Sequence, residues 1–521
     1  MVARRRPPTP RSSPPGPTPG AGGKRGLLVL GNQLFAPALV AKLDVSSAFL
    51  REDRELCTYY RFHQQKIAFY LASMRAYAAE LERAGLAVTY QALGDDAGAY
   101  EQRLVDWCRQ QKLATLVAWQ VEDRWFEQRL QAACQRAHIA LEVHESPMFL
   151  TSRAQAEQMV GGRRRPFMKT FYEAQRRRLG LLLQPSGEPL GGQWSFDADN
   201  RKPLPADVDL PGVPTRRASA EARAATALVE REFADHPGEA AGLWLPTDRA
   251  GARRWLAAFL EQRLAAFGPY EDALSTRDDW LFHSALSPLL NVGWLSPGEV
   301  VRAAVAAAEQ RRVPIASLEG FVRQVAGWRE FIRAIYRQYD EQQQRSNYFG
   351  HERRLAPCWY QGGTGIGPLD DVIDKVLRRG WAHHIERLMV LGNLMLLLEV
   401  APKEAHRWFM EMFVDSSDWV MGPNVYGMAL FSDGGIFATK PYLCGSNYLR
   451  KMGRYAKGPW CDELDGLYWR FVLKHKATFA NNPRLSMMVR SAKRMAEPRK
   501  QIIFAAAERA SARLTRAAKR T

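Results

Sequence analysis

The chain of 521 residues is several times the usual domain size, so its length allows two or three domains with separate hydrophobic cores. Its formal net charge of +18 favours an acidic partner, most simply nucleic acid, although basic tails would give the same charge. No apolar run is long enough to span a membrane, and no apolar signal core begins the chain. We therefore expect a cytoplasmic protein with no membrane partner.

The N-terminal part alternates between strand and helix patterns. Residues 1–25 are rich in Pro, Gly, Ser and Arg, which predicts a disordered basic tail. Strand patterns then lie at 26–34, 87–93, 115–121 and 139–145, and helix patterns lie at 66–85, 102–111 and 127–137. This alternation predicts an α/β domain over 26–150, with a Rossmann-like, doubly wound parallel sheet.

Ligands of such sheets bind at the carboxyl ends of the strands, here near Gly31, Asn32 and Gln33. The sequence has no G-x-G-x-x-G, so we expect no dinucleotide there. Residues 151–225 combine a basic helix with a loop dense in Pro, Gly and Asp, which predicts a long linker. Beyond it the pattern predicts a large all-α domain over 226–500 and a C-terminal basic helix over 501–521.

Residues 377–428 carry the most suggestive polar groups of the helical part. His383 and His384 are adjacent, so one imidazole can face a cavity while the other packs. A following helix carries Trp408 towards Asp415. Such a pair of helices suits a planar cofactor, but it suits an ordinary core equally well.

Two other stretches offer groups that recognise anions. Ser284 and Ser287 flank a helix start, where their hydroxyls and the backbone N–H groups can hold a phosphate or simply cap the helix. Arg329 follows a tryptophan, which pairs a fork-shaped cation with a planar ring and suits a pyrophosphate or a carboxylate.

The cysteines do not form a ligand pattern. None of them stands at C-x-x-C spacing, which predicts reduced and mostly buried thiols and no metal site. The six are Cys57, Cys108, Cys134, Cys358, Cys444 and Cys461.

Taken together and in order, several segments resemble one family. They are GNQL, HQQKIAFYLASMRAYAAEL, ESPMFLTSR, GGQWSFDADNRKPLP, FGPYEDAL, HSALSPLLNVGWLSP, RQVAGWREFIRAIY, AHHIERLMVLGN, the run from DWVMGPNVYGM to GSNYLRKM, and LYWRF. Over residues 26–495 the chain resembles the prokaryotic (6-4) photolyase branch of the photolyase/cryptochrome family, also called the iron-sulfur bacterial cryptochromes and photolyases. The resemblance implies the photolyase fold, in which an α/β antenna domain is followed by an all-α FAD-binding catalytic domain.

The resemblance also implies roles for individual residues. Arg387 and Asp415 would lie near the isoalloxazine of FAD, and the catalytic His384, with His383, would face the lesion. Trp408 and Tyr360 would relay electrons, although the neighbour of Trp408 is a phenylalanine, which is not readily oxidised. The residues implied to line the phosphates and outer rim of FAD are Tyr270, Ser284, Leu286, Ser287, Gln324 and Arg329.

The implied activity is that of a DNA photolyase, a lyase that repairs DNA with blue light. Excited reduced FAD would transfer one electron to a (6-4) pyrimidine photoproduct flipped out of UV-damaged DNA, and a histidine would donate a proton. Alternatives are a cryptochrome-like blue-light photoreceptor without repair activity and a structural DNA-binding protein that has lost FAD. DNA contacts are expected from Lys440, Arg450 and Lys451 of a monomer.

The sequence departs from the family at its iron–sulfur cluster, which needs four cysteine thiolates. Pro368, Ala456 and Pro459 stand where three of these ligands are expected, Cys358 lies too early, and only Cys461 matches. We therefore expect no cluster. The family antenna, 6,7-dimethyl-8-ribityllumazine, would dock near Gly31, Asn32 and Gln33.

Overall fold

The structure, a computed structural model, describes residues 23–94, 98–163, 165–214, 217–482 and 485–517. The chain forms two compact units. The first combines the residues up to Leu30 with Ala36–Asp53 and Ala78–Ser146, and the second contains Gly31–Phe35, Arg54–Tyr77 and the chain from Pro147 onwards. The expected tail lies outside the described residues up to residue 22, and Arg25 already begins a strand.

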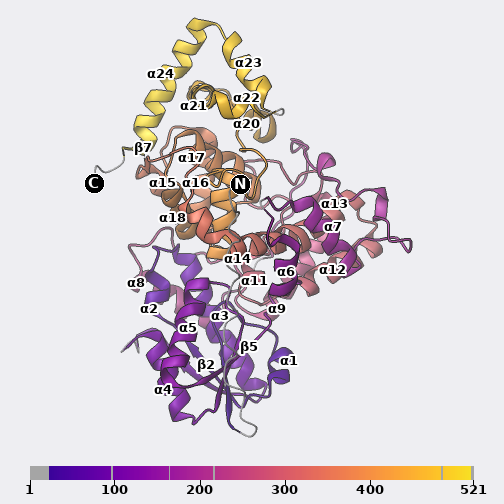
Figure 1. The fold of residues 1–521 in the computed structure, drawn as a ribbon, viewed down its shortest axis with the longest axis vertical. Coiled ribbons are helices and arrows are strands. Elements are labelled where there is room, and N and C mark those ends of the chain that lie inside the picture. The colour runs from indigo at the N-terminus through magenta and orange to yellow at the C-terminus, as the bar shows by residue number, and fades with distance from the viewer. Residues whose placement is uncertain (1–22, 95–97, 164, 215–216, 483–484, 518–521) are drawn as a thin grey trace, which may run out of the picture. The chain divides into compact units, whose positions relative to one another are not determined.

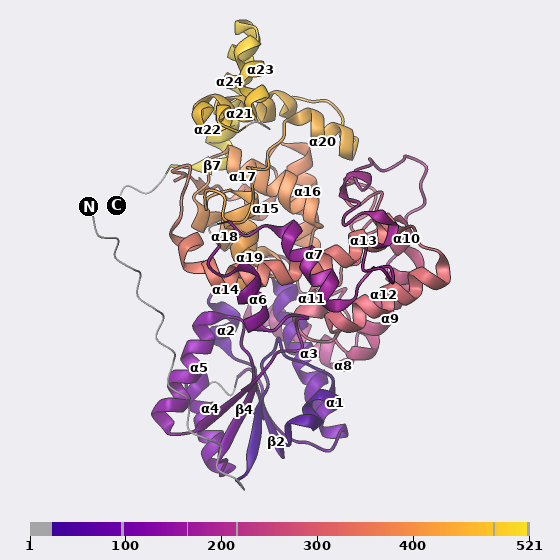
Figure 2. The same ribbon diagram turned by 45° about the vertical axis from the view of Figure 1, so that its right-hand side comes forward.

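The first unit is built on a five-stranded parallel sheet with the strand order β3-β2-β1-β4-β5. This order confirms the predicted doubly wound sheet (Figures 1 and 2). One strand was absent from the prediction, namely β2, and the others are shorter than predicted. The strands are β1 (Arg25–Leu28), β2 (Ser47–Arg51), β3 (Ala87–Gln91), β4 (Thr115–Trp119) and β5 (Ala140–His144).

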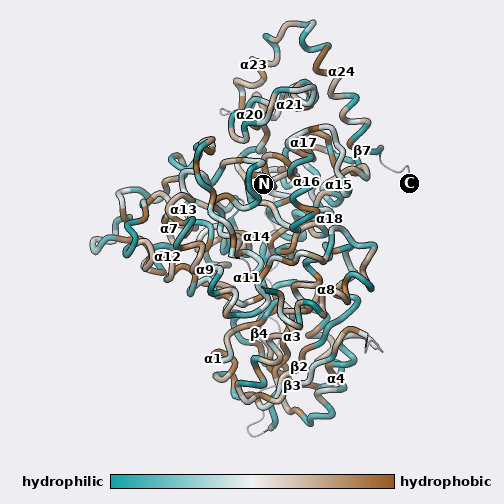
Figure 3. The backbone as a smooth tube through the Cα atoms, turned by 180° about the vertical axis from the view of Figure 1, so that it is seen from behind, coloured by the Kyte–Doolittle hydropathy of each residue, from teal (hydrophilic) through white to brown (hydrophobic). Residues whose placement is uncertain are grey.

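Helices flank this sheet because each has one apolar face. Trp107 of α4 packs its ring 5.3 Å from the ring of Phe49 in β2 and donates a hydrogen bond of 3.0 Å to Thr89 of β3. The sheet strands appear among the brown, apolar segments of Figure 3. The helical segments here are α1 (Pro37–Val40), η1 (Ala41–Leu43), α4 (Tyr100–Gln110), α5 (Arg124–Ala137) and the end of α3 (Gln64–Arg83).

The second unit is mostly helical up to the middle of the chain. The elements are α2 (Arg54–Thr58), α6 (Arg153–Val160), α7 (Met168–Leu179), η2 (Leu190–Gly192), η3 (Asp197–Asp199), α8 (Ala220–Glu232), α9 (Arg249–Gln262), α10 (Leu264–Phe267), α11 (Ser287–Asn291), α12 (Pro297–Arg311), α13 (Ile315–Val322), η4 (Arg323–Trp328) and α14 (Arg329–Arg345). In its described residues, the predicted linker over 151–225 contains the helices α6 and α7, two short 3₁₀ turns and the start of α8.

The remaining helices follow in the same unit. They are α15 (Cys358–Gln361), α16 (Gly367–Arg379), η5 (Glu386–Gly392), α17 (Asn393–Leu397), α18 (Pro402–Met412), α19 (Asp418–Gly422), η6 (Pro423–Ala429), α20 (Ser446–Gly453), α21 (Trp460–Lys474), α22 (Lys476–Ala480), α23 (Ser486–Arg494) and α24 (Glu497–Leu514). No helix in the described part of the chain is both long and apolar enough to cross a membrane.

The C-terminal segment corrects two expectations. The predicted helix over 501–521 is α24, which begins at Glu497 and ends at Leu514. Strand β7 (Thr515–Arg516) then pairs antiparallel with β6 (Arg354–Leu355), so the second unit is not wholly α-helical. Helix α24 packs along α21, where a Cβ on Gly466 would lie only 1.8 Å from the carbonyl oxygen of Ile503. Only glycine allows that approach.

Three segments of the second unit are π-helical rather than α-helical, namely η4, η5 and η6. The wider turn of a π-helix shifts the side chains that follow it, and such turns often occur at functional sites. Segments η5 and η6 are in close contact at Gly392. A Cβ at this position would lie only 2.8 Å from the Cβ of Ala429, so a larger residue would not fit without a shift. These three segments meet around one cavity.

Candidate functional site

The cavity lies inside the second unit and has a volume of about 320 Å³. Its walls come from η4, η5, η6 and the loop that precedes α11. The lining includes three histidines, two arginines, one carboxylate and many apolar groups. The residues are Phe267, His283, Ser284, Ala285, Leu286, Ser287, Leu290, Phe321, Gln324, Val325, Arg329, Trp381, Ala382, His383, His384, Arg387, Leu388, Phe409, Asp415, Val420, Met421, Asn424, Val425, Met428 and Ala429.

An ion pair crosses one wall of the cavity. Arg387 of η5 donates two hydrogen bonds to Asp415, at 2.9 and 3.0 Å, and its guanidinium lies 4.1 Å from the ring centre of Phe413. The hydroxyl of Ser287 donates a further hydrogen bond of 2.6 Å to the same carboxylate. Asp415 is only 4% exposed, so its charge needs these partners.

A second polar group joins this network through α11. The side chain of Asn291 donates to the backbone oxygen of Asp415 at 2.9 Å and accepts a hydrogen bond of 2.6 Å from Arg329. The guanidinium of Arg329 also lies 4.7 Å from the ring centre of Trp419. The predicted arginines and the aspartate are therefore fixed in place by packing and hydrogen bonds.

The loop before α11 has an unusual backbone. Leu281 and Ala285 have φ values of +48° and +50°, in the left-handed region that non-glycine residues rarely adopt. The indole N–H of Trp255 donates a hydrogen bond of 2.8 Å to the carbonyl of Ser284. Surrounding structure holds such strained backbone in place, and strain of this kind is common at functional sites. Here the loop brings His283 into the cavity wall.

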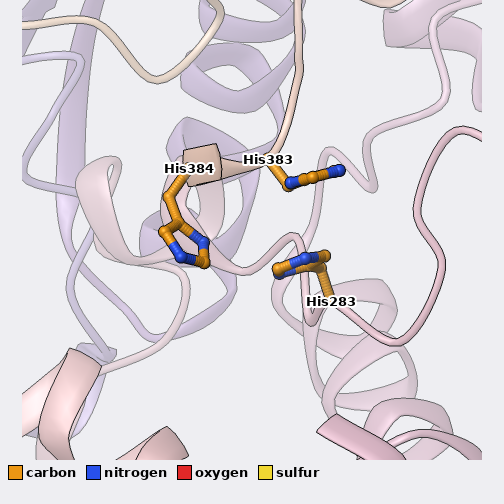
Figure 4. Close-up of side chains that lie close together, drawn as sticks. All are labelled: His283, His383 and His384. Carbon is orange, nitrogen blue, oxygen red and sulfur yellow. The ribbon is translucent and has the colours of Figure 1, made fainter. Parts of the chain in front are cut away.

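Three histidines meet at one side of the cavity (Figure 4). The rings of His283 and His383 stack with centres 4.4 Å apart and an angle of 10° between their planes. His384 lies beside them, and its Nε2 is 3.3 Å from Oδ1 of Asp272. His283 and His383 are buried, whereas the side chain of His384 is 48% exposed. Both members of the His383–His384 pair line the cavity, and they differ in exposure because His383 precedes the helical turn that begins at His384.

The pKa of His384 is shifted in the opposite direction from the pKa values of His283 and His383. Loss of solvation acts to lower the pKa of His384, but the hydrogen bond and negative charge of Asp272 outweigh it and raise the pKa above its ordinary value. Burial lowers the pKa of both His283 and His383. The surroundings therefore favour the neutral form of the buried pair and the protonated form of the exposed imidazole.

A buried ion pair, Glu386 with Lys375, lies next to His383. Glu386 of η5 accepts a short hydrogen bond from Lys375 of α16 and accepts another from the backbone N–H of His383. Burial opposes ionisation of Glu386, but its interactions with His383 and Lys375 outweigh that effect and lower its pKa to about 2. This pair connects α16 to the start of η5 and so fixes the position of His383.

The predicted relay residues lie outside the cavity lining. Trp408 of α18 is fully buried, its ring centre lies 5.9 Å from that of Trp359, and its indole N–H donates to the carbonyl of Trp359 at 3.0 Å. The phenol of Tyr360 donates a short hydrogen bond to Glu411. Phe409, next to Trp408, does line the cavity. Aromatic rings in contact thus lead away from the cavity.

The other predicted residues have different positions. Tyr270 does not line the cavity, because its ring stacks on Phe282 with centres 5.4 Å apart. Gln324 does line it and donates to Glu271. The remaining expected groups lie elsewhere in the fold. Gly31 and Asn32 are half-buried and Gln33 is buried in a loop of the second unit, Lys440 is half-buried, and Arg450 and Lys451 are exposed on α20.

Sequence reasoning missed His283 and Asp272, although both lie in segments that carry the family resemblance. Each stands about a hundred residues before the His383–His384 pair, so spacing along the chain could not connect them. It also missed most apolar walls of the cavity, because an apolar residue at helical spacing is typical of any core.

Comparisons with known proteins agree with this architecture. A family model described as "Deoxyribodipyrimidine photo-lyase-related protein" matches residues 27–244, and one described as "FAD binding domain of DNA photolyase" matches residues 320–492. A bacterial class III photolyase from Agrobacterium tumefaciens superposes with a TM-score of 0.59 at 17% identity, covering 94% of this chain and 96% of that chain. A Synechocystis cryptochrome superposes with a TM-score of 0.57 at 14% identity, covering 93% and 98%. The fold and the cavity thus define a photolyase-fold protein with an FAD-binding domain.

A more specific assignment comes from the sequence of a relative. A (6-4) photolyase from Agrobacterium fabrum is 32% identical to this chain over 492 residues, which cover 90% of this chain and 96% of the relative. The chain belongs to the photolyase/cryptochrome family, in its prokaryotic (6-4) photolyase branch.

The groups around the cavity fit FAD. Arg329 supplies a cation of the kind that binds a diphosphate, and Arg387 and Asp415 supply a donor and an acceptor for the polar edge of a ring system. Apolar side chains such as Met428 and Val425 supply walls for a planar ring. A flavin dinucleotide needs both kinds of group, charged side chains for its polar parts and apolar walls for its rings.

Proposed function

We propose that this protein is a light-driven DNA repair flavoprotein, a photolyase that acts on (6-4) pyrimidine photoproducts. The observation that carries the proposal is a single cavity that combines the Arg387–Asp415 pair with an exposed imidazole, His384, paired with Asp272. The first pair suits a flavin, and the second suits proton donation to a neighbouring substrate. Membership of the (6-4) photolyase branch supports the same activity.

In this proposal the protein residues bind, orient and donate protons. Reduced FAD, when bound, supplies one electron to the lesion on absorbing blue light. Arg329, Gln324 and Ser284 bind its phosphates and outer rim, together with Leu286 and Ser287. Arg387 and Asp415 hold the isoalloxazine side in one orientation, because their mutual ion pair leaves neither side chain free to rotate.

His384 acts as the general acid. Asp272 holds its Nε2, so the other ring nitrogen, Nδ1, is the atom that would donate a proton to the flipped lesion. The contact with Asp272 raises the pKa of His384 and so favours the protonated form that this role needs. His383 is buried, neutral and stacked on His283, so its role is to shape the wall beside the lesion.

Buried aromatic residues would carry electrons towards a bound flavin. Trp408 and Tyr360 are the expected relay, and the contact between Trp408 and Trp359 offers an extension of it. Phe409 stands beside Trp408 and does not take part, since its ring is not readily oxidised.

DNA with UV damage is the expected partner of a monomer. Arg450 and Lys451 lie in the last turn of α20 and are exposed, as phosphate contacts require, and Lys440 lies nearby in sequence. The repair domain of this proposal spans about 226–500, the range in which the sequence pattern is helical.

The proposal includes no iron–sulfur cluster. Pro368 lies in the first turn of α16, and the indole N–H of Trp460 donates a hydrogen bond to the backbone oxygen of Ala456. Pro368 and Ala456 stand at two of the positions where the cluster would need cysteine thiolates. In the described part of the chain, the cysteines join no group of three or more potential metal ligands. Iron analysis of the purified protein tests this: about four iron atoms per chain would contradict it.

A lumazine antenna is proposed at Gly31, Asn32 and Gln33. Gly31 packs against Met74, since a Cβ would lie 3.0 Å from its sulfur, so the backbone there has little spare room. Fluorescence excitation at the lumazine band, with emission from the flavin, tests this assignment. Purified protein that shows flavin bands alone after expression in a lumazine-producing host would contradict it.

One experiment tests the function as a whole. Purified protein is incubated with an oligonucleotide that carries one (6-4) lesion, in the dark and under blue light. We expect flavin absorption bands and light-dependent loss of the lesion. His384→Asn should bind the oligonucleotide but repair it about a hundredfold or more slowly. His138→Asn, at an exposed position of the first unit with φ of +54°, is the control, because asparagine tolerates that backbone.

Two outcomes would contradict the proposal. Protein without flavin bands would exclude both light-driven activities. Protein whose flavin is reduced by light while the lesion persists would favour the cryptochrome-like photoreceptor, which keeps the cofactor and lacks repair.

A further inference from the structure

We propose that His283, His383 and His384 form a binding site for one divalent transition-metal ion, for which Zn²⁺ is the expected occupant. One nitrogen from each imidazole takes part, and these three atoms all lie within 4.8 Å of one another. In the part of the chain that the structure describes, this is the group of three or more potential ligands close enough to share an ion. The cysteines suggested no metal site, but the histidines of the cavity do.

Unpaired nitrogen atoms support the site. Nε2 of His283 and Nδ1 of His383 are buried and have no hydrogen-bond partner among the described residues. Both side chains are more than nine-tenths buried, with residue exposures of 6% and 2%. Buried polar atoms normally have partners, so two orphaned nitrogens beside a third imidazole call for an explanation. A metal ion would use both lone pairs at once.

Carboxylates stand behind two of the three imidazoles. Nε2 of His383 lies 3.4 Å from Oε1 of Glu386, and Nε2 of His384 lies 3.3 Å from Oδ1 of Asp272. Metal-binding histidines usually offer their second nitrogen to a carboxylate or carbonyl, which fixes the ring and raises its basicity. In the proposed site, Nδ1 of both residues and the unpaired Nε2 of His283 would hold the ion.

The donor set identifies the class of ion. Three imidazoles favour zinc, copper, nickel or cobalt over magnesium and calcium, which prefer oxygen ligands. Three histidines with an open fourth position are also the usual ligands of a zinc ion that contacts a substrate. The three histidines line the cavity, so a phosphate or hydroxyl oxygen of a bound substrate could occupy the fourth position.

Binding requires a modest movement. Zinc–nitrogen bonds of about 2.0–2.1 Å place ligand atoms about 3.3 Å apart, so the nitrogens must approach one another and the stacked pair must tilt. His384 can provide much of this movement, because its side chain is 48% exposed. That exposure also gives the ion a route from solvent.

The metal would also control the proposed acid. A metal ion and a proton cannot occupy the same nitrogen of His384, so each bound ion displaces the proton that the repair reaction uses. This consequence rests on the proposed function, whereas the site itself does not. Zinc is therefore expected to slow repair and a chelator to restore it.

Calorimetry with the purified flavoprotein, in the dark and without DNA, tests the site directly. ZnCl₂ is titrated in a buffer that does not chelate it, and we expect about one ion per chain, with MgCl₂ giving no saturable signal. His283→Gln should weaken zinc binding by at least about a hundredfold, and Asp272→Asn by about 10- to 100-fold. His138→Asn, far along the chain in the first unit, should bind zinc as the unaltered protein does.

Two controls keep the result decisive. Each variant is compared at matched flavin absorbance, so that a misfolded cavity is recognised. Electron paramagnetic resonance of the unaltered protein with one equivalent of Cu²⁺ should show splitting from about three nitrogen nuclei, and this needs no variant. Absence of saturable zinc binding, or equal binding by His283→Gln, would overturn the site and leave the stacked imidazoles as a wall of the cavity. Failure of the repair assay alone would not affect these measurements.

Discussion

Arg387 and Asp415 form a two-pronged ion pair, with Nη1 to Oδ1 at 2.9 Å and Nη2 to Oδ2 at 3.0 Å. The two residues come from η5 and from the loop after α18, and their pairing joins two walls of the cavity. The Asp415 carboxylate is buried, so its negative charge is stabilised by the Arg387 cation and by the hydrogen bond from Ser287. The pair is thus a structural requirement of the cavity as well as the proposed contact of the flavin.

Arg387→Met should destabilise the protein by about 3–5 kcal/mol, because it leaves the Asp415 carboxylate buried without a cation. The flavin content of the purified protein should fall as well. Urea unfolding measures the first effect and the ratio of flavin to protein absorbance measures the second. Arg253→Met, which removes an exposed pair with Glu299, is the control and should cost less than about 1 kcal/mol. Full flavin content in Arg387→Met would show that the arginine does not contribute to the flavin site.

Repair should lose activity as the pH rises through the pKa of His384, because the proposed acid must be protonated. Burial and the charge of Arg323 oppose protonation of His384, whereas the hydrogen bond and charge of Asp272 and the charge of Glu271 outweigh them and raise its pKa. Asp272→Asn removes the strongest favourable partner, so the alkaline limb of the pH–rate profile should move to lower pH. Repair rates at saturating light and DNA, measured across the pH range for both proteins, test this. Superimposable profiles would exclude His384 as the acid.

Glu386→Gln should destabilise the protein by about 3–5 kcal/mol, since it leaves Lys375 buried without its partner. The pKa of Glu386 is lowered to about 2, below its unfolded value, so its contribution is present above the unfolded pKa and is lost as pH falls towards 2. Urea unfolding at several acidic pH values should therefore show a shallower pH dependence in the variant. Asp374→Asn, whose side chain is 67% exposed, should change stability by less than about 1 kcal/mol. Equal losses from both variants would refute the importance of the buried pair.

Trp408→Phe should largely abolish light-driven reduction of the flavin, because phenylalanine is not readily oxidised and Phe409 beside it offers no substitute. Flavin binding should persist, since Trp408 does not line the cavity. Steady illumination with an external electron donor, followed by absorption spectra, measures the reduction. Tyr360→Phe tests the second expected member in the same way. Unchanged photoreduction in Trp408→Phe would place the relay on other residues.

The sequence by itself determined the broad organisation of the protein. Alternating apolar patterns specified the parallel sheet, because periodicity reports which side of each element is buried. It did not reveal strand β2, whose charged end looks exposed. In the fold Arg51 is buried and pairs with Asp53 at 3.1 Å, so a tertiary contact compensates the charge that hid the strand.

For the candidate site, too, the sequence identified some residues and the tertiary structure added others. Sequence order and resemblance identified Arg387, Asp415 and His384, since their segments keep the family pattern. Only the tertiary structure joined His283 and Asp272 to them, because contacts between residues about a hundred positions apart leave no local periodicity. The same holds for the pairing of β6 with β7, whose strands are two residues long. Local patterns fix the elements, and packing between distant elements decides which side chains share a cavity.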